Sequence, residues 1–289
     1  MKTLKDIESL LTAHGLTGYY EKIVHTVRSS VRITLESAGD EQIAIGASKM
    51  GGLPDLPKTV DWFRQGQTNT PLSFICQINF AEVKPYDNEG KLPASGILYF
   101  FYDCSMDGMP WGFDPKDINE KVVYYYDGDL ADLERKEAPN DIEENGCVFE
   151  AAELRFETAL DLPDLESPAG ESLGLSDDDR ENYWEMMDEV SESTINKLLG
   201  HSNNIQGSME LECEFVSNGL YCGDPSGYNE GRARGLGKNA EHWNLLLQVD
   251  SNEDIGMMWG DCGRLYLWIT TEDLTAKNFD ASWLILQCG

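Results

Sequence analysis

Positive charge is scarce in this chain. It has 22 Lys and Arg against 52 Asp and Glu among 289 residues, a formal net charge of −30. Such a surface repels nucleic-acid phosphates and anionic lipid head groups, so neither nucleic acid nor a membrane is an expected partner. Residues 127–192 hold 23 Asp or Glu against four Lys or Arg, a net −19. This acidity keeps a protein soluble, and it also favours a basic protein partner.

Long apolar runs and cysteine pairs are missing as well. No apolar run comes close to about 18 residues, the length that a membrane span requires. The chain also does not begin with a charged segment followed by an apolar one. Asn-x-Ser/Thr acceptor sites are absent, and the seven cysteines include neither a Cys-x-x-Cys pair nor zinc-like spacing. We therefore expect a cytoplasmic protein with no metal ion and no other cofactor.

Nucleophilic catalysis would need Cys or Ser beside His. Cys104, Cys222 and Cys262 fall in expected loops, and only His201 and His242 among the four histidines do so. The spacing of these residues in the sequence does not identify a catalytic Cys–His pair. The chain thus has no identifiable catalytic group of residues, and we expect it not to be an enzyme.

The chain contains one sequence motif twice, and we refer to it as the repeated phrase. The first copy covers residues 74–79 and 96–101, and the second covers residues 246–250 and 263–268. Each copy is an apolar strand that ends in Gln, a β-branched residue and Asn or Asp, followed by a loop and a strand with Leu-Tyr at its centre. The phrase predicts two related β-units.

Two glutamines occupy matching positions in this phrase, Gln77 and Gln248. A Gln in a buried strand most often satisfies backbone groups of a neighbouring loop. A structural polar role is therefore the prediction for both, and ligand binding is the alternative.

The remaining patterns predict an α+β protein that is mainly antiparallel β. Period-two alternation and apolar runs place strands at residues 31–35, 42–45, 73–79, 96–102, 121–126, 147–157, 209–215, 243–249, 263–269 and 283–288. Two amphipathic helices that pack on a sheet are expected within residues 1–30. A helix should begin at Asp177 and a short one at Ser193 or Thr194, ending near Gly200, while residues 46–71 form a loop.

These elements give a domain plan. Residues 1–30 form an N-terminal helical segment, and residues 31–289 form the β-rich domain. Within it, the two units cover about 31–160 and 205–289, and an acidic helical insertion covers about 161–204.

Candidate ligand contacts lie in Trp- and Gly-rich loops. Arg232, Arg234 and Lys238 belong to a loop that is either a flexible surface segment or an anion contact. Trp111 and Trp259 stand in Trp-Gly phrases, where the ring either stacks on a ligand or plugs a sheet core.

The loops at 79–95 and 250–262 follow matching strands of the two units. We expect them to meet at the junction, with Trp259, Asp261 and the segment 232–238 nearby, and to form a ligand pocket there.

Several sequence segments occur together in one known family. They are Gly51–Pro57 with Trp62, Pro71–Glu82, Gly96–Tyr102, Lys197–Gly200 with Ile205–Gly207, Leu246–Asp250 and Trp259–Tyr266. On these segments the chain resembles the bacterial YwqG-like family, a domain of unknown function. The resemblance covers about residues 30–289, and it implies a mainly β fold without an established activity.

The sequence favours a binding or interaction protein whose partner is a small molecule or a basic protein. One alternative is an immunity-like neutraliser of a basic protein, based on the acidic segment 127–192. The other is an enzyme for a small or sugar-like substrate, with carboxylates in an aromatic cleft. Its candidate acids and bases, beside Trp111 or Trp259, are Asp103, Asp224, Asp250 and Asp261.

Overall fold

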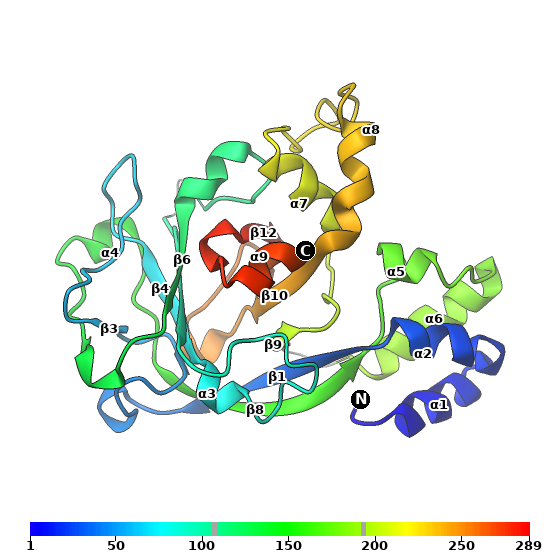
Figure 1. Cartoon of the computed structure of the whole chain (residues 1–289), viewed down its shortest axis with the longest axis horizontal. Helices are drawn as coiled ribbons and strands as arrows, with labels where there is room; N and C mark the ends of the chain where they lie inside the picture. The colour runs from blue at the N-terminus through cyan, green and yellow to red at the C-terminus, as the bar shows by residue number, and fades with distance from the viewer. Residues whose placement is uncertain (106–108, 192–194) are drawn as a thin grey trace.

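One large antiparallel sheet dominates the structure. The computed structural model describes residues 1–105, 109–191 and 195–289. Ten strands in the order β12-β11-β10-β9-β1-β8-β2-β4-β5-β6 curl until the sheet is nearly closed into a barrel, and β3 pairs with β7 beside it (Figure 1). The strands are β1 Arg28–Ser37, β2 Lys49–Met50, β3 Asp55–Pro57, β4 Ser73–Asn79, β5 Ile97–Tyr102, β6 Lys121–Tyr126, β7 Leu133–Arg135, β8 Ala152–Asp161, β9 Asn196–Leu199, β10 Trp243–Asp250, β11 Arg264–Thr270 and β12 Trp283–Gln287.

Strands β1 and β8 form the centre of this sheet. They pair along ten residues, from Arg28 opposite Asp161 to Ser37 opposite Ala152. The short strand β9 continues the sheet beyond β1, and the short strand β2 continues it beyond β8. Four strands therefore lie on each side of the central pair, and we call the β9–β12 side and the β2–β6 side the two halves of the sheet.

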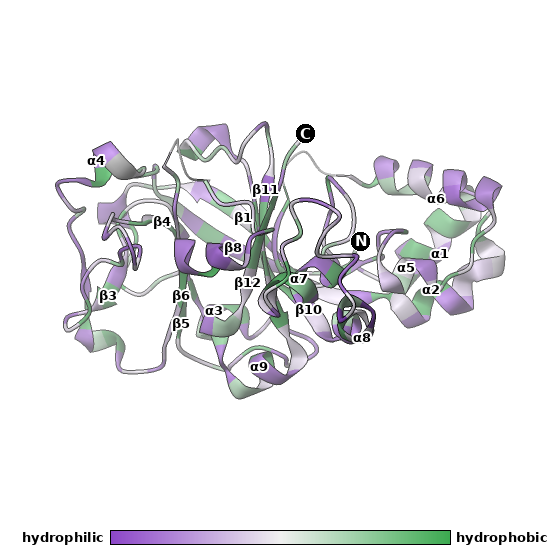
Figure 2. Cartoon of the chain, turned by 90° about the horizontal axis from the view of Figure 1, so that it is seen from above, coloured by the Kyte–Doolittle hydropathy of each residue, from purple (hydrophilic) through white to green (hydrophobic). Residues whose placement is uncertain are grey.

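Four helices gather at one end of the molecule. Figure 2 shows α1, α2, α5 and α6 together there, and we call them the helical layer. Ile7, Leu11 and Ile23 share one buried cluster with Tyr183 and Met186. The helices are α1 Leu4–Ala13, α2 Tyr20–Thr26, α3 Phe80–Val83, α4 Ile142–Asn145, α5 Pro168–Glu171, α6 Asp177–Glu189, α7 Glu210–Ser217, α8 Ala233–Leu236 and α9 Thr271–Ala276, with 3₁₀ turns η1 Thr17–Tyr19, η2 Asp40–Gln42, η3 Pro115–Glu120, η4 Leu130–Asp132, η5 Gly237–His242, η6 Glu253–Ile255 and η7 Phe279–Ala281.

The helical layer corrects one expectation. The N-terminal helices pack mainly against the insertion rather than on the sheet, since their apolar faces meet α6 and the segments on either side of α5. Segments far apart in the sequence thus build one small core, because neither amphipathic pair could bury its apolar stripe alone.

The strand predicted at 209–215 is a helix, α7. Its alternating Glu residues suggested period two, but Met209, Cys213 and Val216 are buried with the spacing of one helical face. Glu214 is also buried, and its Oε2 accepts a hydrogen bond of 3.0 Å from Trp243 Nε1. The prediction assumed that each Glu faces water, but a carboxylate with a hydrogen-bond partner can be buried.

Several other boundaries also differ. Residues 42–45 are not a strand: η2 ends at Gln42, and a turn follows. The segment 46–71 contains β2 and β3, and the strand predicted at 147–157 is β8, shifted toward the C-terminus. Ser193 and Thr194 lie outside the described residues, and the segment up to Gly200 holds β9 where a helix was expected. Pairing of β9 with both β1 and β10 outweighs local propensity there.

Candidate functional site

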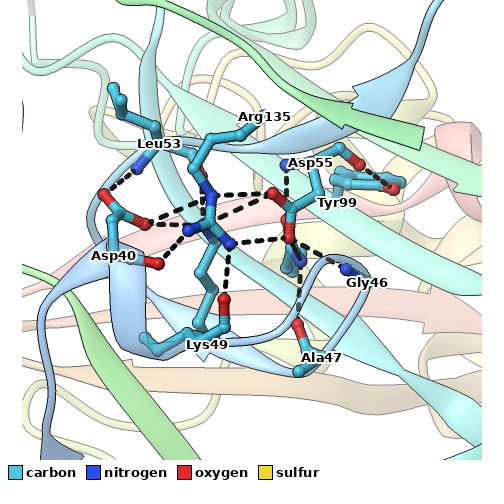
Figure 3. A network of polar contacts seen from close by, with 10 residues as sticks. Asp40, Gly46, Ala47, Lys49, Leu53, Asp55, Tyr99 and Arg135 are labelled. Carbon is cyan, nitrogen blue, oxygen red and sulfur yellow. Dashed lines mark hydrogen bonds and ion pairs between the residues drawn. The ribbon is translucent and has the colours of Figure 1, made fainter.

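A buried network of charges joins η2, β2, β3 and β7. The Lys49 ammonium, fully buried, donates to Asp40 Oδ1 at 2.7 Å and to the carbonyl of Leu53. Arg135 Nε donates to Asp55 Oδ1 at 2.9 Å and Nη1 to the carbonyl of Asp40 (Figure 3). Two cations therefore meet two carboxylates in this first network, and the Arg135 guanidinium fills the space between them.

Gln77 supports the same loop. Its Oε1 accepts from the Asp55 amide at 2.8 Å, and its Nε2 donates to the carbonyl of Ala47 and to Asp55 Oδ2, both at 2.8 Å. The hydroxyl of Tyr99 donates to the Asp55 carbonyl at 2.5 Å. The side chain of Gln77 thus satisfies buried backbone groups, which would otherwise cost free energy.

A second buried network lies in the other half of the sheet. The Lys197 ammonium donates to Asp161 Oδ2 at 2.7 Å, and Arg32 Nη2 donates to Asp161 Oδ1 at 3.1 Å. Burial works to raise the pKa of Asp161, but the charges of Lys197 and Arg32 outweigh it and the pKa lies below its ordinary value. Burial lowers the pKa of Lys197 to about 8 despite the attraction of Asp161.

Gln248 supports the second loop as Gln77 supports the first. Its Oε1 accepts from the Asn203 amide at 2.9 Å, and its Nε2 donates to the carbonyl of Ile195 at 2.9 Å. The hydroxyl of Tyr266 donates to the Asn203 carbonyl at 2.7 Å. Each contact has a counterpart in the first network.

The two lysines occupy the same register. Lys49 lies opposite Gln77 in the β2–β4 ladder, and Lys197 lies opposite Gln248 in the β9–β10 ladder. Two consecutive residues with positive φ angles turn the chain at the end of both strands. The angles are 66° and 68° at residues 51–52, and 60° and 77° at residues 199–200.

The second residue of each turn is a glycine, Gly52 or Gly200, and its missing side chain makes room for the carboxylate. A Cβ on Gly52 would lie 2.4 Å from Asp40 Oδ2, and a Cβ on Gly200 would lie 2.4 Å from Asp161 Oδ2. Both positions need glycine for the positive φ and for this close approach.

The networks differ in charge. Asn203 stands where the first network has Asp55, and the residue opposite the lysine in the central strand is Arg32 in place of Glu153. Arg264 adds a further cation: its Nε lies 2.9 Å from Asp250 Oδ2, and its Nη1 donates to the Asn203 carbonyl at 3.0 Å. In the second network, three cations thus share the two carboxylates Asp161 and Asp250.

A cavity of about 230 Å³ opens beside the second network, between the sheet and the helical layer. We call it the junction cavity. Its polar wall includes Arg32, Lys197 and Arg264, and its apolar wall includes Tyr183 and Met187. Two more lining carboxylates, Asp164 and Asp188, are partly or fully exposed, so water screens their charge.

Several side chains that line the junction cavity carry buried hydrogen-bond donors with no acceptor among the described residues. Among the described residues, Arg32 Nε, Arg32 Nη1 and Asn204 Nδ2 are buried side-chain atoms without a partner. Arg264 Nε has its ion pair with Asp250, but the geometry is not that of a hydrogen bond. Buried donors are normally satisfied, so these atoms are where an acceptor from outside the protein, a water molecule or a ligand, would bind.

The predicted aromatic contacts lie elsewhere. Trp259 is fully buried, with its ring edge-on to Tyr102 and Phe149, which is the core-plugging arrangement. Trp111 is 37% exposed, and its carbonyl accepts from Leu286 at the edge strand β12. Asp261 is exposed, beyond the buried Trp259.

The predicted basic loop is exposed and helical in part. Arg232 bonds the carbonyls of Asn218 and Gly219, and it forms an exposed ion pair with Glu230. Arg234 and Lys238 are exposed on α8 and η5. None of the three lines the junction cavity, so the structure does not bring them together with the network of Lys197.

The matching loops also make different contacts. Phe80, at the start of the segment 79–95, packs against Phe279, whereas Trp259 of the segment 250–262 packs against Tyr102 and Phe149. No described ring contact joins the two loops. The junction cavity is lined by neither loop, and residues 90–93 and Asn252 line two other, separate pockets.

The candidate acids and thiols are also dispersed. Asp250 is committed to Arg264 and to the amide of Ile195, and no contact among Asp103, Asp224, Asp250 and Asp261 occurs in the described parts of the chain. Cys104 and Cys222 donate to backbone carbonyls. Burial lowers the pKa of His201 to about 3, so its neutral ring can donate from Nε2 to the Thr26 carbonyl at 2.7 Å.

The comparisons identify a family without a known activity. No helix in the described residues is long and apolar enough to cross a membrane, and no cluster of potential metal ligands occurs among them. A search of curated proteins found no match. The family model described as "Domain of unknown function (DUF1963)" matches residues 48–288, which include Lys49, Lys197 and both glutamines. The chain belongs to this family of unknown function.

Proposed function

We propose that this protein binds a small monoanionic ligand in the junction cavity. The observation that carries the proposal is the set of buried donors on Arg32 and Asn204 that lack an acceptor. An anionic oxygen would satisfy them, and charge-assisted hydrogen bonds of this kind are the strong ones. The buried network of three cations and two carboxylates has one positive charge in excess, which one ligand carboxylate would balance, while water screens the more exposed Asp164 and Asp188.

The apolar wall suggests the rest of the ligand. Tyr183 and Met187 come from α6 of the helical layer and face the same cavity as Lys197. Ligand sites commonly combine apolar walls with a few polar anchors. We therefore expect a carboxylate with a small apolar or aromatic tail that contacts both the sheet and the helical layer.

The first network explains why one site is expected rather than two. There the Arg135 guanidinium occupies the space beside Asp40 and Asp55, and its charge completes a balanced set. The recurring contacts support a proposed origin as two related β-units, and the junction cavity lies beside the network of the second. Membership of the YwqG-like group and a cytoplasmic location belong to the same proposal, and the seven free cysteines support the location.

The experiment is thermal unfolding of the wild-type protein with a panel of small molecules. Phenylacetate should raise the melting temperature, because a ligand that binds only the folded state stabilises it by about 2.7 kcal/mol at a hundred times its Kd. Phenylacetamide, the neutral analogue, should give no shift, and inorganic phosphate should give a smaller one. Equal shifts for phenylacetate and its amide would contradict the proposal.

A further inference from the structure

The two equivalent lysines differ in how completely their ammonium groups are bound. Lys49 has two acceptors, Asp40 Oδ1 and the Leu53 carbonyl, with Asp55 Oδ1 at 3.8 Å. The side chain of Lys197 is 1% exposed, and among the described residues it has one acceptor, Asp161 Oδ2. A buried ammonium can donate three hydrogen bonds, so Lys197 is the less satisfied of the two.

The surroundings of Lys197 favour its neutral form. Arg32 and Arg264 are nearby cations that oppose its charge, while Asp161 supports it. Burial is the largest effect, and together these influences lower the pKa to about 8. An appreciable fraction of free amine is therefore present near neutral pH, as in lysines that react with carbonyl groups.

We propose that Lys197 forms an imine with a carbonyl group of the ligand in the junction cavity, so that the ligand belongs to the 2-oxo carboxylates. This inference rests on the proposed function, since the carboxylate bound by Arg32 and Asn204 would hold the neighbouring carbonyl near Lys197. Lys49 has the same register, but there the Arg135 guanidinium lies beside Asp40 and Asp55 in the corresponding space.

The chemistry balances with the groups present. Asp161 accepts a proton from the Lys197 ammonium, and the free amine forms a bond to the carbonyl carbon. One proton of the new C–N nitrogen passes to the carbonyl oxygen, which gives a neutral carbinolamine. Asp161 then returns its proton to this hydroxyl, which leaves as water, and a protonated C=N bond replaces C=O. No oxidant or metal is needed.

The test is reductive trapping of the wild-type protein. Sodium cyanoborohydride with glyoxylate or pyruvate should give a stable secondary amine at Lys197, located by peptide mass spectrometry. We expect about ten-fold more adduct at Lys197 than at Lys49, because a desolvated amine reacts only where the carbonyl can reach it. Lys121 is a second control: burial lowers its pKa to about 8 too, but it does not line the junction cavity.

Competition separates this inference from the proposed function. Excess phenylacetate should protect Lys197 and leave adducts at exposed lysines unchanged. If phenylacetate stabilises the protein but no adduct forms at Lys197, the imine is overturned and anion binding stands. If adducts form only at exposed lysines and phenylacetate neither binds nor protects, both ideas fail.

Discussion

Asn203 stands in one half of the sheet where Asp55 stands in the other. The backbone of each donates to a strand glutamine and accepts from a tyrosine hydroxyl. Only Asp55 adds a carboxylate, which binds Arg135. This difference leaves the second network with one positive charge more than its carboxylates balance.

Replacing Asn203 by Asp should therefore supply the missing charge. The side chains have nearly the same size, so folding should be preserved, while the new carboxylate competes with a ligand anion for the same cations. We expect phenylacetate affinity to fall about ten-fold, equivalent to about 1.4 kcal/mol. Titration calorimetry measures this directly, and unchanged affinity would show that the local charge does not govern binding.

The charge balance also predicts unequal costs for removing the two lysines. Lys49→Met leaves Asp40 and Asp55 with Arg135 alone, so a buried carboxylate loses its partner and unfolding should become about 3–5 kcal/mol easier. Lys197→Met leaves Asp161 with Arg32, and should cost about 1–2 kcal/mol. Urea denaturation of both variants measures the difference. A larger cost for Lys197 would refute the balance described here.

Gly200 should be less replaceable than another glycine with the same backbone angle. Its φ is 77°, and a Cβ would lie 2.4 Å from Asp161 Oδ2 and 2.6 Å from Ser30 Cβ. Gly256 has φ 76° and nothing within 4 Å, so Gly256→Ala measures the backbone strain alone, about 1–2 kcal/mol. Gly200→Ala should cost about 2 kcal/mol more. Equal melting temperatures of the two variants would rule out the close contact.

Glu212 on α7 should make stability depend on pH. Burial raises its pKa from 4.5 to about 7, beside Cys213, Cys222 and Tyr228. The folded protein thus holds this proton more tightly than the unfolded chain. The resulting stabilisation is complete below pH about 4.5 and is lost as pH rises through about 7.

The matched variant is Glu212→Gln, which keeps the shape and removes the titration. Because the side chain is partly exposed, we expect it to stabilise the protein by about 1 kcal/mol at pH 8 and to have almost no effect at pH 4.5. Chemical denaturation at the two pH values tests this. The same gain at both would mean that the carboxylate does not titrate as described.

The sequence predicted part of this architecture. The repeated Gln and Leu-Tyr positions lie in β4, β5, β10 and β11, and Gln77 and Gln248 make matching hydrogen bonds. The sequence did not show that the two Lys–Asp pairs are equivalent, because their separations along the chain differ. Lys49 is nine residues from Asp40, whereas Lys197 is 36 residues from Asp161, with α5 and α6 between them. Residue spacing could not predict this shared geometry, because an insertion separates Asp161 from Lys197 in the sequence.

The candidate site was missed for a related reason. Arg32, Lys197 and Arg264 stand on three different strands, and only the pairing of β1, β9 and β10 with β11 brings them together. Arg232 and Arg234 were predicted as ligand contacts because they are close in sequence, but both are exposed. A signal was present in Lys49-Met50-Gly51-Gly52 and Lys197-Leu198-Leu199-Gly200, which share Lys and Gly three residues apart.

The most direct test of anion binding is titration calorimetry of phenylacetate into the wild type, Arg32→Gln and Arg155→Gln. Arg155 is the control, an arginine of the neighbouring strand β8 that is 54% exposed and pairs with Glu36 away from the cavity. The account predicts binding to the wild type and to Arg155→Gln with the same Kd, and at least about ten-fold weaker binding to Arg32→Gln. Absence of binding to the wild type, or equal affinity for all three proteins, would contradict it.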